Sequence, residues 1–173
     1  MQKERIRMKQ EINLSITGLG VIIYSPFATT AITEGEDFLT SHFWQPEKVA
    51  EHVNACQLSA FCTGSPGKFR LNLIDGIYPE DDIRNAIAKI RLGIEVRDQT
   101  LCFRDLYDLM EWTSACPSEQ VISIPTGYYL LTVFTQLPES GVLGDNQMIT
   151  IHFQAVQSRP VLAWNGVPDL SGD

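Results

Sequence analysis

Residues 121–137 constrain the fold of this chain more than any other stretch. They read VISIPTGYYLLTVFTQL, so two runs of alternating apolar residues flank the sequence Pro-Thr-Gly at residues 125–127. Alternation with a period of two indicates β-strands, and a proline followed two positions later by a glycine is typical of a tight β-turn. The segment therefore predicts two strands joined at a turn. Large apolar or aromatic side chains occupy both faces of the second strand, which predicts a strand inside a sheet covered on both sides.

Similar alternating patterns recur along the chain. Residues 11–24 alternate but change phase at Gly18, which predicts one long strand with a bulge or a bend, because one extra residue reverses every later side chain. Residues 58–62 and 68–73 flank a five-residue turn and predict a hairpin. Further strands are predicted at residues 88–96, 101–103 and 148–156.

Helical spacing of apolar residues is confined to two short segments, near residues 46–56 and 106–110. The pattern predicts a mostly β fold, a two-sheet antiparallel β-sandwich with one or two short helical insertions; an open α+β sheet with a helix layer is the alternative. A length of 173 residues fits one domain with a core that needs no disulfide or metal. We expect a charged N-terminal arm at residues 1–10, a single β-sandwich domain at 11–158, and a C-terminal tail at 159–173 that packs across a sheet edge or frays.

The charge of the chain excludes some classes of partner. The net charge is −8, and the first ten residues hold four of the 13 basic residues and one of the 21 acidic ones, so the remainder has 9 basic and 20 acidic residues. An acidic protein of this kind repels nucleic-acid phosphates and favours basic protein partners. The first residues are charged rather than apolar, and the apolar run at residues 19–24 is too short to span a bilayer. We therefore expect a cytoplasmic protein that binds neither nucleic acid nor membranes.

The sequence contains little that indicates catalysis. His42, His52 and His152 have no recurrent spacing, and no serine stands in a GxSxG motif. The four cysteines form no CxxC pair, which favours small buried hydrophobic residues over a metal site; they are Cys56, Cys62, Cys102 and Cys116. We predict no cofactor, no metal and no enzymatic activity. An enzyme remains an alternative, because catalytic triads assemble from residues that are distant in sequence.

Two groups of acidic residues are the candidate partner-binding sites. Glu80, Asp81 and Asp82 follow Pro79 in a loop or at a helix start. The second group recurs at three-residue spacing along one expected exposed side of a short helix and consists of Asp105, Asp108 and Glu111. Neither group has the spacing of a calcium-binding loop, and solvated acidic surface is the alternative interpretation. Residues 25–47 are expected to form a long loop, and its aromatic residues Phe38, Phe43 and Trp44 are the candidate wall of a small-ligand pocket.

The order of four segments resembles a known family. AFCTGSPGKFRLNLI is followed by a strand ending in GIEV, then by ISIPTGYYLLTVFTQLP and a closing MITIHFQAV. This order is similar to the DNA-entry nuclease inhibitor (competence protein J) family over about residues 57–157. The most specific part is an apolar strand with Pro125, Gly127, Tyr129 and a Pro138 that ends the following strand. The basic N-terminal arm, the acidic segment at 105–111 and the tail after Ser158 depart from the family.

The resemblance implies a non-catalytic, acidic binding protein that holds a nuclease inactive in the cytoplasm. A nuclease presents lysine and arginine side chains to phosphates, so a domain that displays carboxylates can occupy the same surface. The sequence leaves a small-ligand-binding β-sandwich, with the aromatic loop as its pocket wall, and an unrecognised enzyme as alternatives.

Overall fold

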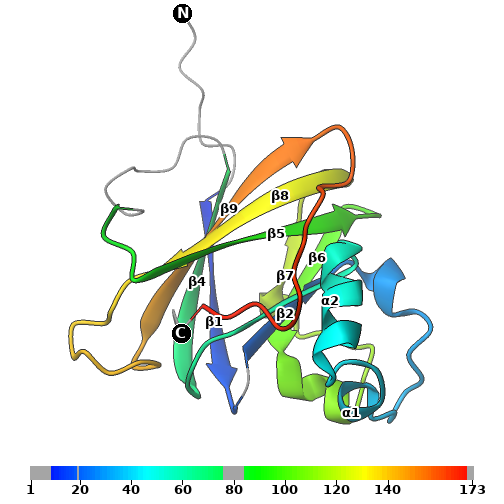
Figure 1. Cartoon of the computed structure of the whole chain (residues 1–173), viewed down its shortest axis with the longest axis horizontal. Coiled ribbons are helices and arrows are strands. Elements are labelled where there is room, and N and C mark those ends of the chain that lie inside the picture. The colour runs from blue at the N-terminus through cyan, green and yellow to red at the C-terminus, as the bar shows by residue number, and fades with distance from the viewer. Residues whose placement is uncertain (1–8, 19, 76–83, 171–173) are drawn as a thin grey trace, which may run out of the picture.

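The structure is a computed structural model that describes residues 9–18, 20–75 and 84–170. In this part of the chain, nine strands form two sheets, with two short α-helices beside them (Figure 1). The five-stranded sheet has the order β1 (Lys9–Ile16), β4 (Gly67–Asp75), β9 (Gln147–Val156), β8 (Gly127–Thr135) and β5 (Ala88–Val96). The four-stranded sheet has the order β3 (Leu58–Cys62), β2 (Gly20–Tyr24), β6 (Thr100–Asp105) and β7 (Val121–Ser123). The helices are α1 (Phe38–His42) and α2 (Pro46–Asn54), and short 3₁₀ helices are η1 (Pro26–Thr29), η2 (Leu106–Met110) and η3 (Ser118–Gln120). The predicted mostly β, two-sheet fold with short helical insertions is confirmed.

One strand pair departs from the expected antiparallel arrangement. β4 and β9 run parallel, with Leu71 opposite Ile149 and Leu73 opposite Ile151, whereas the other named strand pairs are antiparallel. A parallel pair requires a long connection between its strands. Here β5, β6, β7 and β8 lie between them in the sequence.

Four of the tight connections lead from one sheet to the other. β1 and β2, β3 and β4, β5 and β6, and β7 and β8 each follow one another closely in sequence, yet the two members of each couple belong to different sheets. The strand segments exist, but three predictions about how they connect are wrong. The predicted single strand at 11–24 is two strands in different sheets. The strands predicted as a hairpin at 58–73 do not pair with each other, and neither do the two strands joined at Pro125. β8 and β9, in contrast, follow one another in the same sheet and form a hairpin across residues 136–146. β2 with β3 and β6 with β7 also pair antiparallel, across longer connections.

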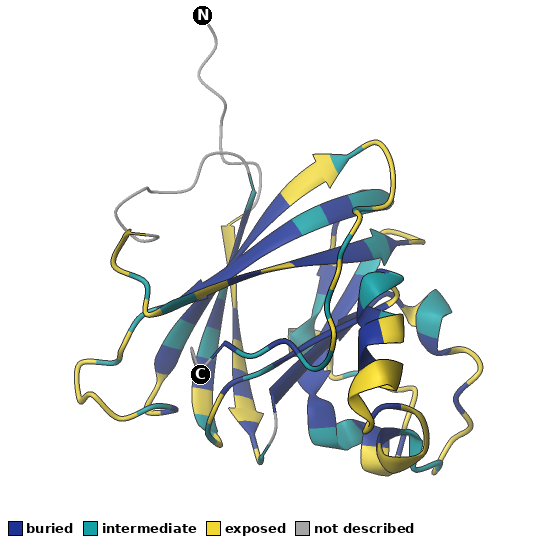
Figure 2. Ribbon diagram, viewed as in Figure 1, coloured by how far each residue is buried: buried dark blue, intermediate teal, exposed yellow. Residues whose placement is uncertain are grey.

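The alternating pattern explains the core. Ile12, Leu14 and Ile16 of β1 are buried at 1–4% exposure, and the residues between them are exposed. In β8, Leu131 and Val133 are fully buried in the main core, and Phe134 between its neighbours is buried at 1% on the opposite face. The prediction of an interior strand is therefore confirmed. Its outer face is covered in part, because Thr132 and Phe134 are buried there and Tyr128 and Leu130 are half-buried. Figure 2 shows the same contrast between buried strands and helices whose outer faces are exposed.

The free edge of β5 is closed by other parts of the chain. The Glu95 amide donates to the Cys56 carbonyl at 2.8 Å, the Ser59 hydroxyl donates to the Gly93 carbonyl, and the Trp164 indole donates to the Arg91 carbonyl at 3.0 Å. Because unpaired edge groups can recruit other strands, these bonds protect the edge from sheet-to-sheet association.

The C-terminal segment packs against the domain, the first of the two outcomes that the sequence left open. The Cys62 amide donates to the Pro168 carbonyl at 2.8 Å, and the Leu170 amide donates to the Cys62 carbonyl at 2.9 Å. This segment therefore extends the edge of the four-stranded sheet beside β3. In Figure 1 it runs from the end of β9 past β5 and α2.

Candidate partner-binding site

Two loops meet at the end of the molecule that carries α1 and η2. The Gly35 amide donates to the Trp112 carbonyl at 2.7 Å, and the Trp112 amide donates to the Glu36 carbonyl at 3.0 Å. The Ser114 amide donates to the Glu34 carboxylate at 2.6 Å. These bonds hold residues 34–37 alongside residues 111–114. We call the five carboxylates gathered here the acidic end; they are Glu34, Glu36, Asp37, Asp108 and Glu111.

The carboxylates of the acidic end differ in exposure and in hydrogen bonding. Glu34 and Glu111 are exposed, whereas Glu36, Asp37 and Asp108 are half-buried. Hydrogen bonds from Ser114 lower the pKa of Glu34, and hydrogen bonds from Thr40 lower the pKa of Asp37. A donor that binds the ionised form stabilises that form. Both groups therefore keep their negative charge into mildly acidic solution.

Asp105 does not belong to this surface. It is buried at 9% exposure and caps η2, where its carboxylate accepts from the Tyr107 amide at 3.0 Å and from both the amide and the hydroxyl of Thr17 at 2.9 Å. The expectation that Asp105, Asp108 and Glu111 share one exposed side of a helix is wrong for Asp105. The aspartate after a strand is a helix N-cap, which residue spacing alone does not distinguish from a surface acid.

A buried arginine on β6 connects the acidic end to the four-stranded sheet. Arg104 of β6 is 4% exposed, and its guanidinium donates to Asp108 at 2.9 Å, to the Thr113 carbonyl at 2.6 Å, to the Thr113 hydroxyl at 3.2 Å and to the Tyr24 hydroxyl at 3.2 Å. It also lies 4.5 Å from the centre of the Trp112 ring. Burial raises the pKa of Tyr24 well above its ordinary value, so the phenol stays neutral. The network ties residues 108–113 to the four-stranded sheet and compensates the charge of Asp108.

Two large apolar side chains are exposed beside these charges. Trp44, two residues after α1, is 54% exposed, and Met110, the last residue of η2, is 47% exposed. α1 packs against η2, so Trp44 and Met110 follow or end elements that contact each other, and Met110 directly precedes Glu111 of the acidic end. Exposed tryptophan and methionine are enriched in protein interfaces relative to other surface.

The three aromatic residues of the predicted pocket wall do not line one hollow. Phe43 is buried at 2% exposure in the main core, whereas Trp44 is mostly exposed. The Phe38 ring packs against three other rings, with centroid distances of 6.5 Å to Phe43, 5.1 Å to His42 and 5.7 Å to His52. The expected long loop contains α1 and the start of α2. The other predicted acidic group, Glu80, Asp81 and Asp82, lies outside the described residues.

The sequence missed the contribution of residues 34–37. Glu34, Glu36 and Asp37 stand in a stretch that the sequence identifies only as loop, about 75 residues before Glu111. The backbone hydrogen bonds that join them depend on the packing of Trp112, which no local pattern reveals. The cluster of acids in EGED at residues 34–37 was the available signal.

The described residues give no positive indication of a catalytic centre. Among them, no group of three or more His, Cys, Asp or Glu side chains is placed to hold a metal ion. His42 and His52 lie on α1 and α2 beside the phenylalanine rings, and His152 lies on β9. Within residues 9–18, 20–75 and 84–170, no helix is long and apolar enough to cross a membrane.

Comparison with known proteins identifies structures but no sequence relatives. No protein-family model matches the chain, and no curated protein sequence matches it. The crystal structure of ComJ, an inhibitor of the DNA degrading activity of NucA from Bacillus subtilis, is 12% identical, with a TM-score of 0.53 over 90% of this chain and 100% of that chain. The structure of crocagin biosynthetic gene J is also 12% identical, with a TM-score of 0.55 over 84% of this chain and 97% of that chain. At this identity the likeness establishes the fold alone, and on that level the chain has the fold of the nuclease inhibitor ComJ, as the family resemblance implied.

Proposed function

We propose that this chain is a non-catalytic binding protein that masks a basic surface of a protein partner, such as a nuclease, with its acidic end. The observation that carries the proposal is the pairing of residues 34–37 with 111–114, which gathers carboxylates from two distant parts of the sequence on one surface. The ComJ fold supports the choice of partner class, because ComJ inhibits a nuclease. The second similar structure belongs to crocagin biosynthesis, so the fold alone does not identify the partner, which has to be tested directly.

The mechanism is charge complementarity around an apolar centre. A surface that binds phosphates presents lysine and arginine side chains, and an opposing set of carboxylates attracts them over about one Debye length, near 8 Å at physiological salt. Trp44 and Met110 supply apolar area that is desolvated on contact, which is where interfaces concentrate their binding energy. The bound inhibitor then excludes nucleic acid from the basic surface.

A comparison of two charge reversals tests the location of the site. Glu111→Lys reverses a charge at the acidic end, and Glu139→Lys makes the same change in net charge on the exposed 136–146 loop between β8 and β9. Neither side chain makes a hydrogen bond or ion pair within the described part of the chain, so both variants should fold normally. The wild-type protein is used to recover the partner from native cell extract, and surface plasmon resonance then gives association rates over a salt series.

We expect Glu111→Lys to slow association several-fold and to flatten its salt dependence, with Glu139→Lys close to wild type. Trp44→Ala should increase the dissociation rate, since an interfacial aromatic acts mainly on the lifetime of a complex. Equal kinetics for Glu111→Lys and Glu139→Lys would exclude the acidic end as the contact. Loss of function in His42→Gln, His52→Gln or His152→Gln with an intact fold would instead favour the enzyme hypothesis.

A further inference from the structure

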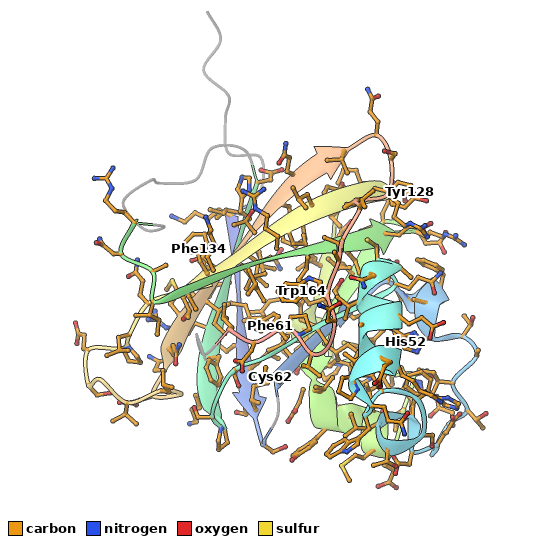
Figure 3. The ribbon with its side chains drawn as sticks, in the orientation of Figure 1. His52, Phe61, Cys62, Tyr128, Phe134 and Trp164 are labelled. Carbon is orange, nitrogen blue, oxygen red and sulfur yellow. The ribbon has the colours of Figure 1, made fainter. Side chains whose placement is uncertain are left out.

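A groove lies outside the five-stranded sheet, between the sheet and the C-terminal segment. Its volume is about 760 Å³, within the range of about 300–1,000 Å³ that is typical of small-molecule sites. Leu130 of β8 and Val156 of β9 line it from the sheet side, and Pro160, Leu162 and Trp164 line it from the C-terminal segment. In Figure 3, Trp164 lies between that segment and β5. The acidic end contributes no residue to this groove.

The wall formed by the C-terminal segment is held in place. The Trp164 amide donates to the Asn54 side-chain oxygen at 3.0 Å, and the Asn54 side-chain nitrogen donates to the Trp164 carbonyl at 2.9 Å. The Trp164 indole donates to the Arg91 carbonyl at 3.0 Å. A side chain on Gly93 would meet Pro160 at 3.1 Å, so the absence of a Cβ atom there lets the segment lie against β5. The groove is therefore present before any ligand binds, which lowers the entropic cost of binding.

The charges in the groove have a sign opposite to that of the protein. Arg91 and Arg159 line it, and within the described residues neither guanidinium lies within 4.0 Å of a carboxylate. Glu95, on the same face of β5 as Arg91, is paired with Arg97 at 2.6 Å. In a chain with a net charge of −8, two unpaired arginines beside an apolar surface are a local reversal of charge. Guanidinium groups bind carboxylates in a bidentate manner.

We propose that this groove binds a small organic acid, with its carboxylate on Arg91 and Arg159 and its apolar body against Leu130, Val156 and Leu162. The apolar lining contributes affinity through the area that it removes from water. The arginines select an anion over a cation or a neutral molecule of the same shape. The site is independent of the proposed inhibitor function, because it shares no residue with the acidic end.

Three probes of equal chain length test the selection: octanoate, octylammonium and 1-octanol. Binding is followed by the indole N–H resonance of Trp164 in ¹H–¹⁵N spectra, assigned with Trp164→Phe. We expect octanoate to shift this resonance in a saturable way, with at least about tenfold tighter binding than octylammonium, since a charge-assisted contact of about 1.4 kcal/mol corresponds to that factor. 1-Octanol should bind between the two. Octylammonium binding as tightly as octanoate, or octanoate leaving the Trp164 resonance unshifted, would overturn the proposal.

Matched charge removals place the carboxylate. Arg91→Gln and Arg159→Gln should each weaken octanoate binding at least about fivefold, a change of about 1 kcal/mol, and leave 1-octanol binding unchanged. Lys89→Gln is the control, because it removes the same charge from the exposed face of β5 two residues from Arg91 but outside the groove. All three side chains are exposed, so melting temperatures should match the wild type. Equal octanoate affinity in all three variants would show that the arginines do not select the ligand.

Discussion

Replacement of the buried Arg104 tests how the acidic end is held on the sheet. Arg104→Met keeps the volume of the side chain and removes every donor, so the Thr113 carbonyl and the Tyr24 hydroxyl lose their partner. Each buried polar group left without a hydrogen bond costs about 1–3 kcal/mol. The contact with the Trp112 ring contributes about 0.5–2 kcal/mol more. Two effects offset part of this loss. The Asp108 side chain is 39% exposed, so water can solvate its carboxylate once the arginine is gone, and the variant no longer has to desolvate a buried guanidinium.

The net loss of stability should therefore be about 3–5 kcal/mol, in the range found when one partner of a buried ionic network is removed. For a domain of this size that corresponds to a fall in melting temperature of about 6–20 °C. Differential scanning calorimetry measures the change. The melting temperature of Arg104→Lys should lie between those of the wild type and Arg104→Met, because one ammonium group cannot contact both Asp108 and Thr113 as the planar guanidinium does.

A double-mutant cycle with Asp108→Asn separates the ion pair from the rest of the network. Asp108→Asn should cost about 1–3 kcal/mol in the wild-type background and close to nothing beside Arg104→Met, because the coupling resides in that pair. A melting temperature of Arg104→Met within about 2 °C of wild type would correspond to less than about 1 kcal/mol and would refute the supporting role of Arg104.

Three further predictions concern the fold. Leu131→Asp should unfold the domain, because an unpaired carboxylate at a fully buried position costs several kcal/mol against a total of about 5–15, and an unchanged melting curve would contradict the position of β8. Burial beside the Phe38 ring lowers the pKa of His52 from its ordinary 6.5, so the unfolded chain takes up a proton first and stability should fall as the pH drops below about 6.5; His52→Gln should reduce that fall in a pH series of melting temperatures. Gly20→Ala should destabilise the protein by about 1–3 kcal/mol in urea denaturation, because a Cβ atom there would lie 2.0 Å from the Phe61 carbonyl oxygen, and wild-type stability would show that β2 and β3 separate easily.

The candidate sites were predictable only in part. Asp108 and Glu111 of the acidic end were candidates from sequence, since an acid in a polar segment needs no partner to be picked out as a candidate. The role of Asp105 was not, because its carboxylate serves as a cap for η2 and accepts from Thr17, 88 residues away. The two arginines of the groove lie on β5 and after β9, and only the path of the C-terminal segment brings them together.

The sequence by itself determined the positions of most strands, the interior place of β8 and the mostly β class. These follow from an alternation with a period of two, which is a local property of the backbone. It did not determine which strands pair. At Gly18, at residues 63–66 and at Pro125 the local signals are those of bends and tight turns, and the same signals serve a chain that passes from one sheet to the other.

The tertiary structure decided between these alternatives through burial. β2 is apolar on every residue and fully buried, so it needs cover on both faces. Pairing with β3 and β6 in the four-stranded sheet satisfies its backbone on both edges. Its side chains are buried in the core that the two sheets share, and the Tyr24 ring also contacts Trp112. The same packing places Trp112 where its backbone joins residues 34–37, and so the acidic end exists only in the folded protein. Contacts between residues far apart in sequence form where they let the whole chain bury the most apolar surface. A short window of residues does not contain that information.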